Sequence, residues 1–226
     1  MDARAIAAAA LAARPAKPLV FAACLVPMGW TLWLAASGGL GAEPVAEGVR
    51  QSGLWALRFL LLALAVTPLR RLTGLAGLAR LRRMIGLFAF FYALLHVLTY
   101  VGVDQFFDWH AVWLDIVRRP YITVGLAAFT VLALLAATSP VAVVRRLGGR
   151  RWRALHKGVF AAGALGCLHY VMLVKGWQAT PVVYALIFAA LAAARLPVPG
   201  LTAGSRRRTR SCEPPPRRST AGTARG

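Results

Sequence analysis

The sequence predicts an all-α membrane protein, a bundle of about six transmembrane helices with both termini in the cytoplasm. Hydrophobic residues make up 59% of the chain and the mean hydropathy is +0.63, whereas a soluble domain is usually about 45–50% apolar. The apolar residues come in blocks, several of them close to the roughly 20 residues that cross about 30 Å of hydrocarbon. Basic clusters separate these blocks in an alternating pattern, which is typical of a multi-pass membrane protein.

The apolar blocks predict six spans in chain order. These cover residues 18–37, 53–68, 84–103, 121–138, 158–174 and 180–194. The second and sixth blocks are short for a full crossing. The first is longer than the roughly 7–15 apolar residues of a signal peptide, so we expect it to be retained as the first helix.

The connecting segments alternate in charge, and this alternation predicts the orientation. The first and third loops contain acidic side chains beside a few basic ones: Glu43, Glu47, Asp104, Asp108 and Asp115. The second and fourth loops contain basic charges and no acid, in clusters around Arg82 and Arg150. Because cytoplasmic loops carry the excess of Lys and Arg, we expect the even loops and both termini in the cytoplasm. An odd number of helices would break the alternation.

Composition divides the chain into three regions. Residues 1–17 form a cytoplasmic N-terminal segment, residues 18–196 the membrane domain, and residues 197–226 an Arg- and Pro-rich cytoplasmic tail. Such a tail cannot bury an apolar core and is expected to be disordered, held near anionic lipid by its charge.

Several classes of function are disfavoured. The net charge of +20 lies in clusters between apolar blocks and in the tail, so no basic face of a soluble fold predicts nucleic-acid binding. Cys24, Cys167 and Cys212 have no disulfide or CxxC spacing. No Asp or Glu falls within an expected span, although proton-coupled carriers usually relay protons through intramembrane carboxylates.

Two histidines fall inside expected spans at matching depth. His96 lies eight residues before Asp104, and His169 lies six residues before Lys175, which places both about 9–12 Å below those outer charges. Two imidazoles facing each other across a bundle are what six-coordinate haem iron needs. The alternative is that each ring hydrogen-bonds a neighbouring helix without binding metal.

A third histidine, His156, is harder to assign as the ligand of an inner haem. His156 precedes His169 by thirteen residues, about 20 Å along a helix but some 140° apart in azimuth. The position thirteen before His96 is Arg83, so the inner site has one imidazole and an unidentified second ligand. The sequence therefore predicts one or two haems.

Other residues have two interpretations each. Arg58, inside the second expected span, either snorkels or binds a haem propionate. The glycines of the fifth span permit close approach either of a flat ring or of a helix. Trp109 and Trp113 are expected in an interfacial aromatic belt.

Four stretches resemble a known family. They are LRRMIGLFAFFYALLHVLTY, the outer loop DQFFDWHAVWLDIVRRPYITVGLAAF, LALLAATSP, and WRALHKGVFAAGALGCLHYVMLVKGW. Together they are similar to the MsrQ (YedZ) family of haem-binding membrane subunits, in the ferric-reductase-like transmembrane group. The resemblance covers about residues 18–196 and excludes the tail.

The resemblance implies a function. The family takes electrons from the membrane quinone pool, passes them through b-type haem, and delivers them to MsrP, a periplasmic molybdopterin enzyme that reduces methionine sulfoxide in proteins. The family's haem histidines correspond to His96, His156 and His169, and FMN is associated with the family. By this resemblance the chain is an electron-transfer subunit of the bacterial inner membrane, without a methionine-sulfoxide site of its own. The wider ferric-reductase group often has four haem histidines. Arg83 stands here in place of the fourth, which argues against two equivalent bis-histidine haems.

Two other functions remain open. A transmembrane ferric reductase or another cytochrome b electron carrier would use the same histidines, but a self-contained reductase needs an NAD(P)H and flavin domain, and no GxGxxG segment is present. A haem-free structural or transport protein is the third hypothesis, and the absence of a Soret band would favour it.

Overall fold

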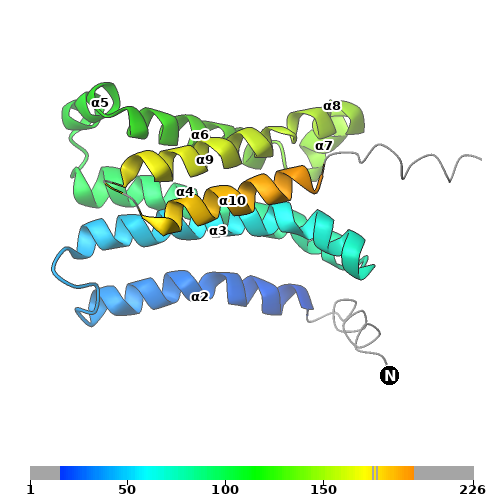
Figure 1. The fold of residues 1–226 in the computed structure, drawn as a ribbon, viewed down its shortest axis with the longest axis horizontal. Helices are drawn as coiled ribbons and strands as arrows, with labels where there is room; N and C mark the ends of the chain where they lie inside the picture. The colour runs from blue at the N-terminus through cyan, green and yellow to red at the C-terminus, as the bar shows by residue number, and fades with distance from the viewer. Residues whose placement is uncertain (1–15, 175, 177, 196–226) are drawn as a thin grey trace, which may run out of the picture. The chain divides into compact units, whose positions relative to one another are not determined.

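The computed structural model describes residues 16–174, 176 and 178–195, which form helices and connecting turns (Figure 1). The expectations for the N-terminal segment before residue 16, for Cys212 and for the tail lie outside the described residues. The helices in chain order are α2 (Ala16–Ala36), α3 (Pro44–Thr73), α4 (Leu78–Leu98), the π-helical η1 (Thr99–Asp104), α5 (Trp109–Arg118), α6 (Pro120–Ala137), α7 (Val141–Leu147), α8 (Gly149–Leu155), α9 (Gly158–Leu173) and α10 (Ala179–Ala193).

In the described part of the chain, four helical segments are long and apolar enough to cross a membrane. They are α2, α3, the continuous segment formed by α4 and η1, and α6. The helices α9 and α10 contain 16 and 15 residues, about 24 and 22 Å, and are shorter than a full crossing. The multi-pass helical class is therefore confirmed, with four candidate spans.

The second span is longer than predicted. We expected residues 53–68, but α3 runs for 30 residues from Pro44 to Thr73. Its polar first turns continue the helix because Glu47 binds Arg50 and Gln51 within one turn. Hydropathy marks where a helix is apolar and misses its polar extensions.

The helices pack side by side around α3 (Figure 1). The most extensive contacts join α3 to α4 and α6 to α9, and α4 against α6 connects these two pairs. The helix α2 covers α3 and α4, while α10 covers α9 and α3. Tyr92 and Ala162 lie at the centre of the larger core, both almost completely buried.

The helix α2 contains a proline whose effect on the backbone is repaired from α4. Pro27 has no N–H and interrupts the hydrogen-bond ladder of α2. The Tyr92 hydroxyl accepts from the Met28 N–H at 3.0 Å and donates to the Cys24 carbonyl at 2.9 Å. These two groups would bond each other in a regular helix, so the tyrosine is inserted into the ladder of α2.

A second proline lies in α3 and is repaired from the end of α10. Pro68 cannot donate to the Leu64 carbonyl, four residues earlier. Arg195 donates from Nη2 to that carbonyl and to the Ala63 carbonyl at 3.3 Å. Its guanidinium also lies 5.5 Å from the centre of the Phe160 ring. The charged side chain thereby joins α10 to α3 and α9.

The outer loop contains a short amphipathic helix. The Asp108 carboxylate caps α5 by accepting from the His110 and Ala111 N–H groups, each at 3.0 Å. Trp109 and Trp113, one turn apart on α5, are both exposed. This arrangement agrees with the aromatic belt expected at the outer interface.

Candidate haem site

His96 lies near the C-terminal end of α4 and is anchored to α3. Its Nδ1 is 2.8 Å from the carbonyl oxygen of Val49. Gly53 lies one turn further along α3, and a Cβ built there would lie 2.9 Å from His96 Nδ1, closer than real Cβ contacts allow. The ring therefore occupies the space that the missing side chain of Gly53 leaves open.

His169 on α9 is anchored to α6 in the same manner. Its Nδ1 is 2.6 Å from the carbonyl oxygen of Tyr121. Gly125 lies one turn after that carbonyl, and a Cβ built there would lie 2.7 Å from His169 Nδ1. The two histidines thus share one arrangement, a carbonyl and a glycine four residues apart on the neighbouring helix.

These anchors determine the tautomer of both rings. A carbonyl oxygen can only accept, so each Nδ1 carries the hydrogen and each Nε2 keeps its lone pair. Histidine ligands of metals are typically oriented by a hydrogen bond that the other ring nitrogen donates to a carbonyl or carboxylate. Both rings are therefore in the form that binds iron through Nε2.

The two rings also lie at the separation that a shared metal atom requires. Their centroids are 6.3 Å apart and their planes are inclined by 78°. A metal–imidazole bond is about 2 Å long and the ring centroid lies about 1 Å behind the nitrogen, so two axial imidazoles on one atom have centroids about 6 Å apart. The pair at matched depth predicted from the sequence is present, and it fits one bis-histidine haem iron.

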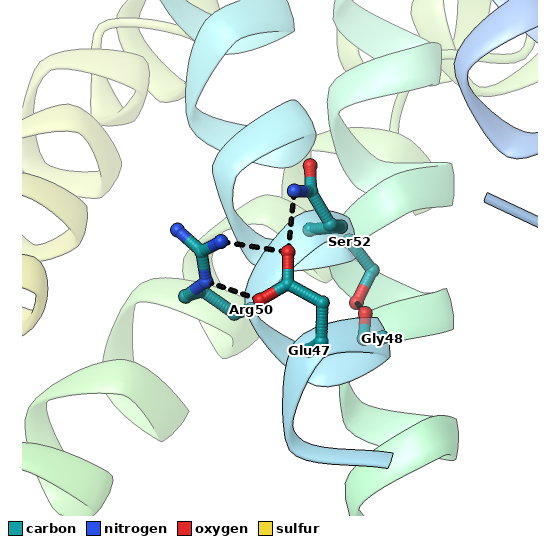
Figure 2. A network of polar contacts seen from close by, with 5 residues as sticks. Glu47, Gly48, Arg50 and Ser52 are labelled. Carbon is teal, nitrogen blue, oxygen red and sulfur yellow. Dashed lines mark hydrogen bonds and ion pairs between the residues drawn. The ribbon is translucent and has the colours of Figure 1, made fainter. Parts of the chain in front are cut away.

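Polar contacts join neighbouring residues in the first turns of α3, around Val49 in the sequence, among them those of Glu47 with Arg50 and of Ser52 with Gly48 (Figure 2). Glu47 accepts from Arg50 at 2.6 and 2.7 Å and from Gln51 at 2.7 Å. Ser52 lies 2.9 Å from the carbonyl oxygens of both Gly48 and Val49. Polar contacts within one helix therefore order the backbone that positions His96.

His156 lies apart from this pair, in the turn between α8 and α9. Its Nε2 is 3.3 Å from the hydroxyl of Thr138, and its ring lies 4.1 Å from that of Trp152. Burial, and after it the positive charge of Arg82, lower the pKa of His156. The chain turns at His156 between α8 and α9 instead of continuing as one helix, so the straight-helix spacing from His156 to His169 does not apply.

Two residues singled out from the sequence contact neighbouring helices or rings. Arg58 donates from Nε to the Tyr184 hydroxyl of α10 at 2.8 Å and lies over the Trp55 ring. Gly163 of α9 faces the Phe188 ring of α10, where a Cβ would lie 2.5 Å from the nearest ring atom. This glycine serves helix packing.

Sequence reasoning missed the two glycines that matter most for the site. Gly53 and Gly125 lie in apolar helices other than those that carry the histidines. A glycine within an apolar span was the available signal, since it often marks a close approach. The histidine that approaches each one follows only from tertiary packing.

Comparison with known proteins finds one matching family and several similar proteins. The family described as ferric reductase like transmembrane component matches residues 52–167. The "Protein-methionine-sulfoxide reductase heme-binding subunit MsrQ" of Rhodospirillum rubrum is 52% identical over 177 residues, 78% of this chain and 85% of that protein. The proteins of the same name from Brucella anthropi (52% over 178 residues, 79% of this chain and 80% of that protein) and Caulobacter vibrioides (45% over 173 residues, 76% and 82%) are also similar.

Proposed function

The chain belongs to the MsrQ family of haem-binding subunits, within the ferric-reductase-like transmembrane group, and on this premise we propose that it carries electrons from membrane quinol through b-type haem to a periplasmic molybdopterin reductase of the MsrP type. That partner would repair oxidised methionines in periplasmic proteins. The observation that carries the proposal is the pair His96 and His169, each anchored through Nδ1 with its Nε2 available to iron.

The residues of the chain would act by binding and orienting the cofactor. His96 and His169 would hold the outer haem from α4 and α9, and the carbonyls of Val49 and Tyr121 prevent the rings from turning away. His156 would contribute to an inner haem on the cytoplasmic side, and FMN is included as an associated cofactor by family resemblance. Bound haem supplies reversible one-electron transfer, with a potential set by its ligands and their hydrogen bonds.

The overall reaction balances without any other reactant. A quinol loses two electrons and two protons when it becomes a quinone. A sulfoxide that takes up two electrons and two protons becomes a thioether and water. The membrane subunit is needed because the quinol is confined to the lipid while the oxidised proteins lie in the periplasm.

We further propose that the protein lies in the bacterial inner membrane with six spans and both termini in the cytoplasm. Charge alternation supports this orientation, since the connections from α2 to α3 and from α4 to α6 contain acidic side chains, whereas the basic residues around the connection from α3 to α4 and between α6 and α9 have no acidic neighbour in the sequence. The short α9 and α10 pack against α6 and α3, which supports their crossing as well.

Haem-quantified absorption spectra of the wild type and of His96→Ala, His169→Ala and His156→Ala test the cofactor assignment. We expect His96→Ala or His169→Ala to remove the outer low-spin signal and His156→Ala to leave it. His110→Ala is the matched control, because His110 is exposed on α5. An intact haem spectrum in either of the first two variants would contradict the pairing.

A second measurement tests the electron acceptor. Quinol should drive reduction of methionine sulfoxide by a co-purified periplasmic reductase only when the membrane subunit is present. The family match to ferric reductase like components favours one alternative, a ferric reductase. Quinol-dependent reduction of a ferric chelate, without transfer to the periplasmic enzyme, would favour that function instead.

A further inference from the structure

A cavity of about 370 Å³ lies between α2, α3 and α4 beside the candidate haem site. Its wall includes Leu95, which precedes His96 on α4, and Thr99, the first residue of η1, three residues after His96. It also includes Gly48 and Ser52, which flank Val49, the residue whose carbonyl anchors His96. The cavity therefore lies next to the residues that hold His96, a proposed iron ligand. Its volume lies within the range of about 300–1,000 Å³ usual for small-molecule sites.

The helix α2 forms one wall of this cavity. Near Pro27 the helix is joined to α4 by the inserted Tyr92 hydroxyl. Beyond Pro27, the side of α2 that carries Thr31 and Ala35 lines the cavity. A Cβ built at Gly48, on the opposite wall, would have no neighbour within 4 Å.

The lining is apolar apart from four hydroxyl groups and the indole N–H of Trp55, and it contains no charged side chain. The hydroxyls belong to Thr31, Ser52, Tyr92 and Thr99. Each donates its hydrogen to a backbone carbonyl at 2.8–2.9 Å. Their hydrogens are thus engaged, and only oxygen lone pairs remain for a ligand. The cavity suits a neutral, lipid-soluble molecule that donates hydrogen bonds.

We propose that this cavity is the quinol-binding site. A quinol carries two hydroxyl donors, which the free lone pairs of the lining hydroxyls can accept. Trp55 adds an aromatic wall for the flat ring. This inference rests on the proposed function and specifies where its electron donor binds.

The experiment compares a variant that fills the cavity with one that does not. Haem-loaded protein in nanodiscs is mixed with duroquinol, and haem reduction is followed by absorption. Gly48→Leu and, independently, Ala35→Leu place a side chain in the cavity, while Gly29→Leu is the control, because Gly29 is exposed on α2 with no neighbour within 4 Å of an added Cβ. We expect at least tenfold slower reduction by duroquinol in the first two variants, with reduction by dithionite unchanged in all three.

A hydroxyl variant tests the hydrogen bond to the quinol. Thr99→Val keeps the shape and removes one acceptor, so the KM for duroquinol should rise about 2–10-fold, the usual effect of one neutral hydrogen bond. An unchanged KM would overturn the contact between Thr99 and the quinol.

The outcomes separate this inference from the proposed function. Rates equal to the wild type in both cavity-filling variants, with a wild type that duroquinol reduces, would overturn the site and leave the function standing. Such a result would assign the cavity to a lipid chain. A wild type that dithionite reduces and duroquinol does not would overturn the function and the site together.

Discussion

At the scale of single residues, the site depends as much on two glycines as on the histidines. His96 and His169 each use Nδ1 to bond a backbone carbonyl, and each ring lies against a glycine one turn further along that helix. Any larger residue at Gly53 or Gly125 would compete with the imidazole for the same space. The orientation of the ligands is therefore determined by residues that bind nothing themselves.

We expect Gly53→Ala and Gly125→Ala to displace their histidines and to weaken haem retention about tenfold or more, as loss of outer-shell support does at other metal sites. The added methyl would lie 2.9 Å from His96 Nδ1 in the first variant and 2.7 Å from His169 Nδ1 in the second. Haem content, the position of the Soret band and the midpoint potential are the measurements.

Gly86→Ala is the control for this prediction. Gly86 lies in α4, where an added Cβ meets nothing within 4 Å, so the same substitution should leave the haem unaffected. Wild-type spectra and potentials in the Gly53 and Gly125 variants would show that the close approach of these glycines does not position the ligands.

At the scale of elements, two helices contain prolines whose defects are repaired by side chains from elsewhere in the bundle. Tyr92 of α4 repairs α2 near Pro27, and Arg195, after α10, repairs α3 at Pro68. Water cannot satisfy these groups within hydrocarbon, so neighbouring side chains must do so. Each repair also joins two helices that are distant in sequence.

A double-mutant cycle tests the repair of α2. Tyr92→Phe leaves the Met28 N–H and the Cys24 carbonyl without their partner and should lower the free energy of unfolding by about 1 kcal/mol. In a Pro27→Ala background the regular ladder can re-form, so the same change should cost less. Thermal unfolding followed by circular dichroism measures both effects, and strictly additive costs would refute the coupling.

At the scale of the whole molecule, the open question is how many helices cross the membrane. Four segments are long enough by themselves, while α9 and α10 are short and lie against longer neighbours. His169 is carried by α9, so the proposed depth of the haem pair depends on α9 crossing. The segment between α9 and α10 is where six spans and four spans differ most clearly.

Single cysteines in a Cys212→Ser background locate the loops. We expect Ala42→Cys, His110→Cys and Gln178→Cys to react with an impermeant maleimide in spheroplasts. Ala76→Cys and Arg145→Cys should react only after the membrane is opened. The native Cys24 and Cys167 are buried and should give little background. Labelling of Gln178→Cys on the same side as Arg145→Cys would rule out the crossing of α9 and α10.

The sequence by itself determined the helical membrane class, the alternation of charge and the pairing of His96 with His169. Hydropathy, loop charge and residue spacing are local quantities, so a linear reading can recover them. It did not find the polar first turns of α3, where ion pairs within a turn extend a helix beyond its apolar part.

Only the tertiary structure decided which carbonyls and glycines hold the two imidazoles, and that His156 lies in a turn beside Thr138 and Trp152. It alone showed that Tyr92 enters the ladder of α2 beside a cavity. These features join atoms on helices that are distant in the chain. Their positions follow from how the helices rotate and bend against one another, which no local pattern in the sequence specifies.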